Sequence, residues 1–179
     1  MHGGKSLFVD SFAAAETLRT THPEDFARLA TTPVPFHYIN DTRHLHYARP
    51  TITLDPAGGG GGGAEPQVTA VSYSPPFQAP LHRDTPPEFY DALARYAELV
   101  EAPSAVYAFQ LNEGDAVIFD NRRMLHGRTA FQSKGSGNAS GHRDAAGQAN
   151  RWLKGCYFEG DIMASRARIL RDKAARGEL

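Results

Sequence analysis

Two low-complexity segments place the strongest limits on what this chain can fold into. Six consecutive glycines, Gly58–Gly63, form the centre of a segment from residue 57 to residue 64, and residues 132–150 consist mainly of Gly, Ser, Ala, Asn and Gln. Such glycine-rich sequence has too much backbone freedom to hold a helix or a strand. We therefore expect 57–64 and 132–150 to be exposed loop insertions, and the fold to be built from the remaining segments.

The bulk properties of the chain are those of an ordinary globular protein. Its 179 residues suit one domain (1–179) with a real hydrophobic core. Apolar residues make up 41% and charged residues 22%, with a net charge of −1, which gives no electrostatic reason to expect nucleic acid or an anionic membrane as a partner.

The sequence also indicates the compartment. Its single cysteine, Cys156, excludes an internal disulfide and fits a reducing environment. No stretch approaches the ~18–20 apolar residues of a membrane span. The N-terminal residues lack the pattern of a signal or transit peptide. We expect a cytoplasmic protein.

Outside the insertions, the apolar pattern predicts many short strands and few helices. Strands are expected at 6–10, 34–39, 51–54, 68–73, 105–111, 116–120 and 152–159. Helices are expected at 12–19 with Ser11 as N-cap, at 23–29, at 88–100 and at 164–175. Phe89, Leu93, Tyr96 and Val100 share one face of the third helix. This pattern favours an all-β sandwich or jelly roll with added helices.

The strongest functional pattern is GDAVIFDNRRMLHGRTAF, residues 114–131, in which a strand-like run leads to His126. A histidine at the end of a strand is a candidate metal ligand. Judged without any relative, however, His126 is an ordinary strand-end histidine. Arg151 is then a surface charge and Tyr157 a half-buried core aromatic.

Other histidines give weaker signals. His44 and His46 share one strand face at i, i+2 and could chelate a metal, but no carboxylate or third histidine has matching spacing, so we interpret them as structural. The triplet His82-Arg83-Asp84 precedes His126 in the order that an iron triad needs, yet it lies in a predicted connecting loop. His142-Arg143-Asp144 follows His126 inside the second insertion, which is the wrong order.

Three motif blocks carry a resemblance to a known family. FDNRRMLHGRTAF contains D-N-x-R-x-L-H-G-R, and RWLKGCYFEGDIMASRARIL contains R-x-L-x-G-x-Y and S-R-x-R-I-L, in that order. These blocks are similar to the C-terminal end of the gamma-butyrobetaine dioxygenase and trimethyllysine dioxygenase group, within the taurine-dioxygenase-like iron(II)/2-oxoglutarate oxygenases. GGKSLFVDSF, HPEDFARLATTPVPF and VSYSPPFQAPL also resemble this group, so the resemblance covers nearly the whole chain outside the insertions.

The resemblance implies a fold and a set of site residues. The fold would be mainly β with flanking helices, an incomplete double-stranded β-helix (jelly roll). In these enzymes two histidines and one carboxylate hold Fe(II), and His126 matches the distal histidine. Arg151 matches the arginine that binds the far carboxylate of 2-oxoglutarate, with Arg128 as the alternative. Tyr157 matches an aromatic of the cage around a trimethylammonium substrate.

The implied reaction is hydroxylation of gamma-butyrobetaine to carnitine. The alternatives are trimethyllysine dioxygenase and a non-catalytic remnant or interaction module. In the family, the H-x-D or H-x-E ligands lie upstream of the segment that resembles GGKSLFVDSF, so we expect a C-terminal portion whose isolated chain binds Fe(II) weakly. We expect a small-molecule trimethylammonium substrate and neither nucleic acid nor membrane as a partner, and we leave a homodimer open.

Overall fold

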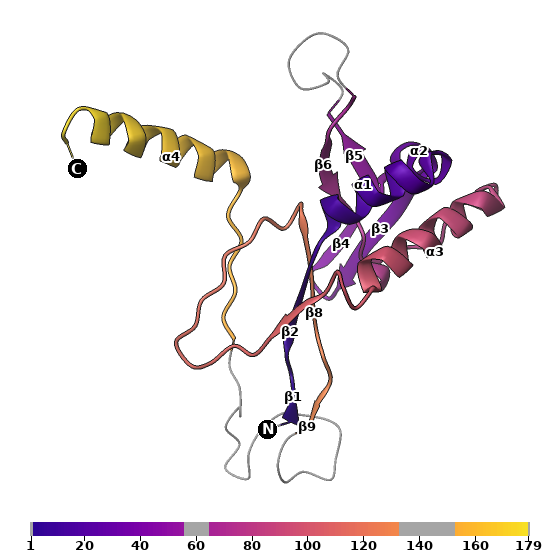
Figure 1. Ribbon diagram of the computed structural model, residues 1–179, viewed down its shortest axis with the longest axis horizontal. Coiled ribbons are helices and arrows are strands. Elements are labelled where there is room, and N and C mark those ends of the chain that lie inside the picture. The colour runs from indigo at the N-terminus through magenta and orange to yellow at the C-terminus, as the bar shows by residue number, and fades with distance from the viewer. Residues whose placement is uncertain (1, 56–64, 133–152, 179) are drawn as a thin grey trace. The chain divides into compact units, whose positions relative to one another are not determined.

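A computed structural model of the protein describes residues 2–55, 65–132 and 153–178 (Figure 1). The chain separates into two compact units, Met1–Gln132 and Ser133–Leu179. The predicted insertion 57–64 lies outside the described residues, as does 132–150 apart from Gln132. A single domain over 1–179 stays a prediction.

The described elements follow one another in a mixed order of strands and helices. They are β1 (His2–Gly3), β2 (Ser6–Asp10), α1 (Ser11–Thr21), α2 (Pro23–Thr31), β3 (Pro33–Asn40), β4 (Arg43–Pro50), β5 (Ile52–Leu54), β6 (Val68–Val71), the 3-10 turn η1 (Pro75–Phe77), α3 (Pro87–Glu101), β7 (Tyr107–Phe109), β8 (Met124–Arg128), β9 (Phe131–Gln132) and α4 (Gly160–Ala175).

The N-terminal strands pair with the strands that contain the His126 motif. β2 lies between β7 and β8 in a three-stranded antiparallel sheet, and β1 pairs with β9. β1–β2 and β8–β9 therefore run side by side, as the indigo and orange strands of Figure 1 show. Gly4 joins β1 to β2 with a φ of 75°, a conformation that strains any residue with a side chain. Its N–H donates to the carbonyl of Ala130 at 3.0 Å.

Helix α1 begins one residue after the end of β2. Its N-cap is Asp10, whose carboxylate accepts hydrogen bonds from the backbone N–H groups of Phe12 and Ala13 at 3.1 and 3.3 Å. The prediction that Ser11 caps this helix was wrong. Ser11 is buried, and its hydroxyl donates to the carbonyl of Arg123 at 2.5 Å, so it is not available as a cap.

The core of the first unit lies where α1, α2 and α3 contact one another. Phe89, Tyr96 and Val100 of α3 are buried as predicted, and Leu93 is partly buried against the same cluster. Each fully buried side chain of this size contributes about 1.5–3 kcal/mol. Strands β2, β3, β5 and β6 and the helices α1 and α2 complete the core with Val9, Ala14, Ala15, Leu18, Phe26, Leu29, Val34, Ile52, Val68 and Val71.

Two further strand pairs belong to the first unit. β3 and β4 form a long antiparallel hairpin whose turn is closed by Asn40. The Asn40 side-chain oxygen accepts hydrogen bonds from the N–H groups of Thr42 and Arg43 at 2.9 and 2.8 Å. β5 pairs with β6, with a shift of register at Thr53/Leu54.

The described part of the second unit is one segment and one helix. α4 covers the predicted helix 164–175 and begins about one turn earlier, at Gly160. Residues 153–159, predicted as part of a strand, have no regular structure. The described residues of this unit include no strand, so this segment has no neighbouring strand there with which to form a sheet.

The described residues form a mixture of helices and small antiparallel sheets, where a mainly β fold was expected. The sheets are two or three strands wide, and they do not by themselves confirm a double-stranded β-helix. The predicted strand 116–120 has no regular structure, because no described strand pairs with it. None of the described helices is long and apolar enough to cross a membrane.

Candidate active site

His126 lies at the third of the five positions of β8, directly opposite Phe8 of β2. The prediction that it ends a strand was wrong, because β8 continues to Arg128. Side chains alternate between the two faces of a strand, so Leu125 points the other way and packs against the core. His126 therefore points away from the core, and its side chain is exposed.

Two aromatic rings lie beside His126 on this face. The ring centroid of His126 lies 5.1 Å from that of Phe119 and 6.4 Å from that of Phe8. Phe8 in turn contacts Phe119 edge-on at 4.9 Å and stacks on Phe109 at 5.7 Å. We call Phe8, Phe109, Phe119 and His126 the aromatic face. Within the described residues, the imidazole of His126 makes no hydrogen bond, so both of its nitrogens are open to a ligand.

An ion pair holds the turn before β8 against the start of α1. The Arg123 guanidinium donates to both carboxylate oxygens of Asp10, with distances of 2.6 to 3.2 Å. The hydrogen bond from Arg123 is the main cause that lowers the pKa of Asp10, although partial burial opposes it. The backbone N–H of Ser11 also donates to the Arg123 carbonyl at 3.0 Å. These contacts hold β8 in the register that places His126 opposite Phe8.

The roles of Asp10 and Arg123 were missed by sequence reasoning. Arg123 belongs to the D-N-x-R-x-L-H-G-R block and was therefore visible as part of a motif. Its partner Asp10 lies 113 positions away in the sequence. Only the pairing of β2 with β8 brings the two side chains together.

The described residues supply one ligand position and not a complete iron site. No three His, Cys, Asp or Glu side chains among them come together in a way that could hold a metal ion. His82 and Asp84 lie in the exposed loop before α3, with 3.4 Å between Nδ1 and Oδ2, which agrees with the loop interpretation. His142 and Asp144 lie outside the described residues.

The described residues do not show Arg151 or Tyr157 beside His126. Arg151 lies outside the described residues. Tyr157 belongs to the second unit, where its side chain is 85% exposed. Arg128 is on the same face of β8 as His126, two residues along the strand. The roles predicted for Arg151 and Tyr157 stay predictions, as does the choice between Arg151 and Arg128.

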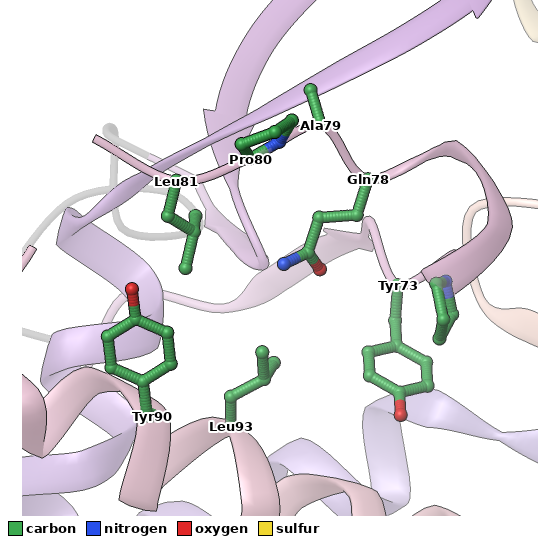
Figure 2. A pocket seen from close by; sticks show the side chains of 8 residues that line it. Tyr73, Gln78, Ala79, Pro80, Leu81, Tyr90 and Leu93 are labelled. Carbon is green, nitrogen blue, oxygen red and sulfur yellow. The ribbon is translucent and has the colours of Figure 1, made fainter. Parts of the chain in front are cut away.

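A recess of about 480 Å³ lies elsewhere in the first unit, between α3 and the segment around η1. Figure 2 shows the amide of Gln78 pointing into it, with Leu81 and Tyr90 on one side and Tyr73 on the other. Its polar groups are amides and phenols, which bind ligands but do not act readily as acids or bases at neutral pH. Its lining residues are Tyr73, Pro75, Gln78, Ala79, Pro80, Leu81, Tyr90 and Leu93.

Comparison with known proteins gives the family. The model of the taurine catabolism dioxygenase TauD, TfdA family matches residues 1–157. The chain belongs to the TauD/TfdA family. The resemblance inferred from the motif blocks is thereby confirmed.

Three curated relatives show how much of a TauD/TfdA protein the chain represents. Dioxygenase str8 of Strobilurus tenacellus is 46% identical, over 96% of this chain and 37% of the relative. Gamma-butyrobetaine dioxygenase of Pseudomonas sp. (strain AK-1) is 34% identical, over 94% and 39%. Trimethyllysine dioxygenase of Meyerozyma guilliermondii is 27% identical, over 94% and 38%. The chain spans about two-fifths of the length of these relatives, which is consistent with a C-terminal portion.

Proposed function

We propose that this chain is the part of an iron(II)- and 2-oxoglutarate-dependent dioxygenase that carries the distal histidine ligand. The observation that supports this most directly is the position of His126. It lies in the D-N-x-R-x-L-H-G-R block of a TauD/TfdA family chain, on the aromatic face, with its own side chain exposed and its imidazole nitrogens open. The other histidine and the carboxylate would come from outside the described residues, because these residues offer no complete site. Once bound, the iron would supply the oxygen chemistry that hydroxylates the substrate while 2-oxoglutarate is decarboxylated to succinate.

In this proposal the chain's own residues bind and orient. His126 is held in register by the Asp10–Arg123 pair. Arg151 donates two parallel hydrogen bonds to the far carboxylate of 2-oxoglutarate. Tyr157 presents a π-face to a trimethylammonium group. The protein acts as a cytoplasmic enzyme on a small molecule, without nucleic acid or membrane as a partner, and a homodimer is compatible with this role.

We further propose gamma-butyrobetaine as substrate and carnitine as product. The support is 34% identity to a gamma-butyrobetaine dioxygenase, against 27% to a trimethyllysine dioxygenase. The 46% identity to Dioxygenase str8, a name that gives no substrate, supports a second candidate, a dioxygenase that acts on another substrate. A non-catalytic remnant is the third.

Turnover by a protein that contains this chain tests the proposal. The protein would be incubated with Fe(II), 2-oxoglutarate, oxygen and either gamma-butyrobetaine or trimethyllysine, and succinate and hydroxylated product would be measured by mass spectrometry. We expect gamma-butyrobetaine to stimulate succinate formation and to give carnitine, and His126→Ala to abolish both. Stimulation by trimethyllysine alone would identify trimethyllysine as the substrate in place of gamma-butyrobetaine. Absence of succinate with either compound, in a folded protein shown to bind Fe(II) and 2-oxoglutarate, would favour another substrate. Failure to bind Fe(II) would favour the remnant.

A further inference from the structure

We propose that His44 and His46 of β4 form a two-histidine site for a divalent transition-metal ion of the zinc type. This site is distinct from His126, the proposed iron ligand, and does not depend on the proposed dioxygenase function.

The geometry of the two imidazoles carries the proposal. His44 and His46 are two residues apart on one strand, so their side chains lie on the same face of the hairpin. Their Nε2 atoms are 2.8 Å apart, and their ring centroids are 4.8 Å apart. Two nitrogens bound tetrahedrally to zinc at 2.0–2.1 Å are about 3.3 Å apart. A small rotation of the two rings would therefore be enough to place both nitrogens on one ion.

The paired strand supplies a neighbour that the sequence spacing did not reveal. His37 of β3 lies directly opposite His46 in the hairpin register. Its ring meets the ring of His46 edge-on, with centroids 6.0 Å apart and planes at 85°. This contact restricts the orientation of His46. We assign His37 to packing and not to coordination, because no three-ligand group exists among the described residues.

The site is open to an ion from solution. Both histidines of β4 are exposed, and imidazole nitrogen is a preferred ligand of zinc, copper and nickel. Water would complete the coordination. Without metal, the short Nε2–Nε2 distance is a hydrogen bond in which one ring donates and the other accepts. Metal binding would replace this hydrogen bond, so the two nitrogens should respond together.

Zinc titration of the full chain, followed by imidazole ¹⁵N chemical shifts near neutral pH, tests the proposal. We expect the Nε2 signals of His44 and His46 to move together and to saturate at one equivalent of Zn²⁺. His44→Gln and His46→Gln should each weaken zinc binding on the order of 10-fold or more, because a chelate becomes a single contact. Both variants alter exposed hairpin positions, so the fold should be retained, which circular dichroism would verify.

Three matched variants keep the test specific. His126→Gln and His82→Gln should leave zinc binding at the hairpin unchanged, and His37→Phe, which keeps a ring against His46, should change it less than about twofold. If either single glutamine variant of β4 binds zinc as the natural chain does, the metal contact is adventitious and the proposal is wrong. It is also wrong if His126→Gln or His82→Gln removes the binding. A tenfold loss in His37→Phe would replace the two-histidine site with a three-histidine one.

Discussion

At the scale of single residues, Asp10 connects three parts of the first unit. It is the last residue of β2 and the N-cap of α1. It is also the partner of Arg123 in the turn that leads to β8. One carboxylate thus sets where a helix begins and where the strand of His126 lies. Its lowered pKa reflects this, with the Arg123 hydrogen bond as the largest cause.

The pH dependence of folding stability in the variant Asp10→Asn should reveal the role of the Asp10 charge. The pKa of Asp10 is lower in the folded chain than in the unfolded chain, where it is roughly 3.9. The charge of Asp10 therefore stabilises the fold fully above the unfolded pKa. This contribution is lost as the pH falls through the lowered folded pKa. Asparagine still caps a helix, so the variant removes mainly the charge. We expect a lower urea midpoint than the natural chain at pH 7 and a difference that shrinks as the pH falls below about 4.

The matched control is Asp91→Asn on α3, an exposed residue for which no ion pair is found within the described residues. It should change the urea midpoint little at any pH. A deficit of Asp10→Asn that stays constant from pH 7 to pH 2 would contradict the role given to the charge.

Tyr96→Phe tests a buried hydrogen bond between α3 and the start of α1. Tyr96 is fully buried, and its hydroxyl donates to the carbonyl of Ser11 at 3.2 Å. Burial is the main cause that raises the pKa of Tyr96 above the ordinary range, so the hydroxyl keeps its proton and remains a donor. Loss of this hydrogen bond should cost about 0.5–1.5 kcal/mol of unfolding free energy in urea denaturation. Tyr90→Phe, at an exposed position of the same helix, should cost less. Equal losses in both variants would argue against the hydrogen bond.

At the scale of elements, an ionic cluster around a buried aspartate joins α2 to α3. Asp25 of α2 is only 5% exposed. Its carboxylate pairs with Arg28, one turn along α2, at 3.1 Å, and with Arg95 of α3. The arginine side chains remain 36% and 48% exposed, so their charges stay in contact with water. The cluster therefore sets how the two helices pack without burying an arginine.

Asp25→Asn should destabilise the α2–α3 packing. Removing the charge leaves two arginines without their shared partner, but their exposure limits the penalty to about 1–3 kcal/mol, below that of a fully buried pair. Glu24→Gln is the control, because Glu24 forms an exposed pair with Arg28 and should matter by less than about 1 kcal/mol. Urea denaturation of both variants measures the difference. Similar small losses in the two would show that the buried carboxylate has no special role.

At the scale of the whole molecule, the proposed activity depends on residues from both units. His126 lies in the first unit, while Arg151 and Tyr157 belong to the second. A test of the roles proposed for Arg151 and Tyr157 therefore measures the affinities for both 2-oxoglutarate and the trimethylammonium substrate. It also decides between Arg151 and Arg128 as the arginine that binds 2-oxoglutarate.

In a protein that contains this chain, we expect Arg151→Lys and Tyr157→Leu to weaken the binding of different ligands. Arg151→Lys should weaken 2-oxoglutarate by about 1–3 kcal/mol, because lysine keeps the charge but loses the paired donors. The trimethylammonium substrate should be affected much less. Tyr157→Leu should do the reverse and weaken the substrate by about 0.5–2 kcal/mol. Apparent affinities for both compounds measure this. If Arg128→Lys raises the 2-oxoglutarate requirement and Arg151→Lys does not, the assignment of Arg151 is wrong.

Features that neighbouring residues encode could be predicted without the structure. Helix α3 and its buried face follow from a proline start and apolar spacing, and β2 and α4 were located within a few residues. Family membership followed from motif blocks of fixed local spacing, which need no knowledge of the fold. A helix makes its hydrogen bonds within a few residues, so its signals lie next to one another in the chain.

Features that depend on partners distant in the sequence could not be predicted, and they followed only from the folded structure. A strand needs a second strand for its hydrogen bonds, so residues 116–120 have no regular structure despite their apolar pattern, while β8 forms against β2. The same pairing explains why the N-cap is Asp10 and not the predicted Ser11. It brings the Arg123 carbonyl, just before β8, to the Ser11 hydroxyl. Hairpin register placed His37 beside His46, which no spacing along one strand predicts. Each of these outcomes depends on a contact between segments whose proximity is created only when the chain folds.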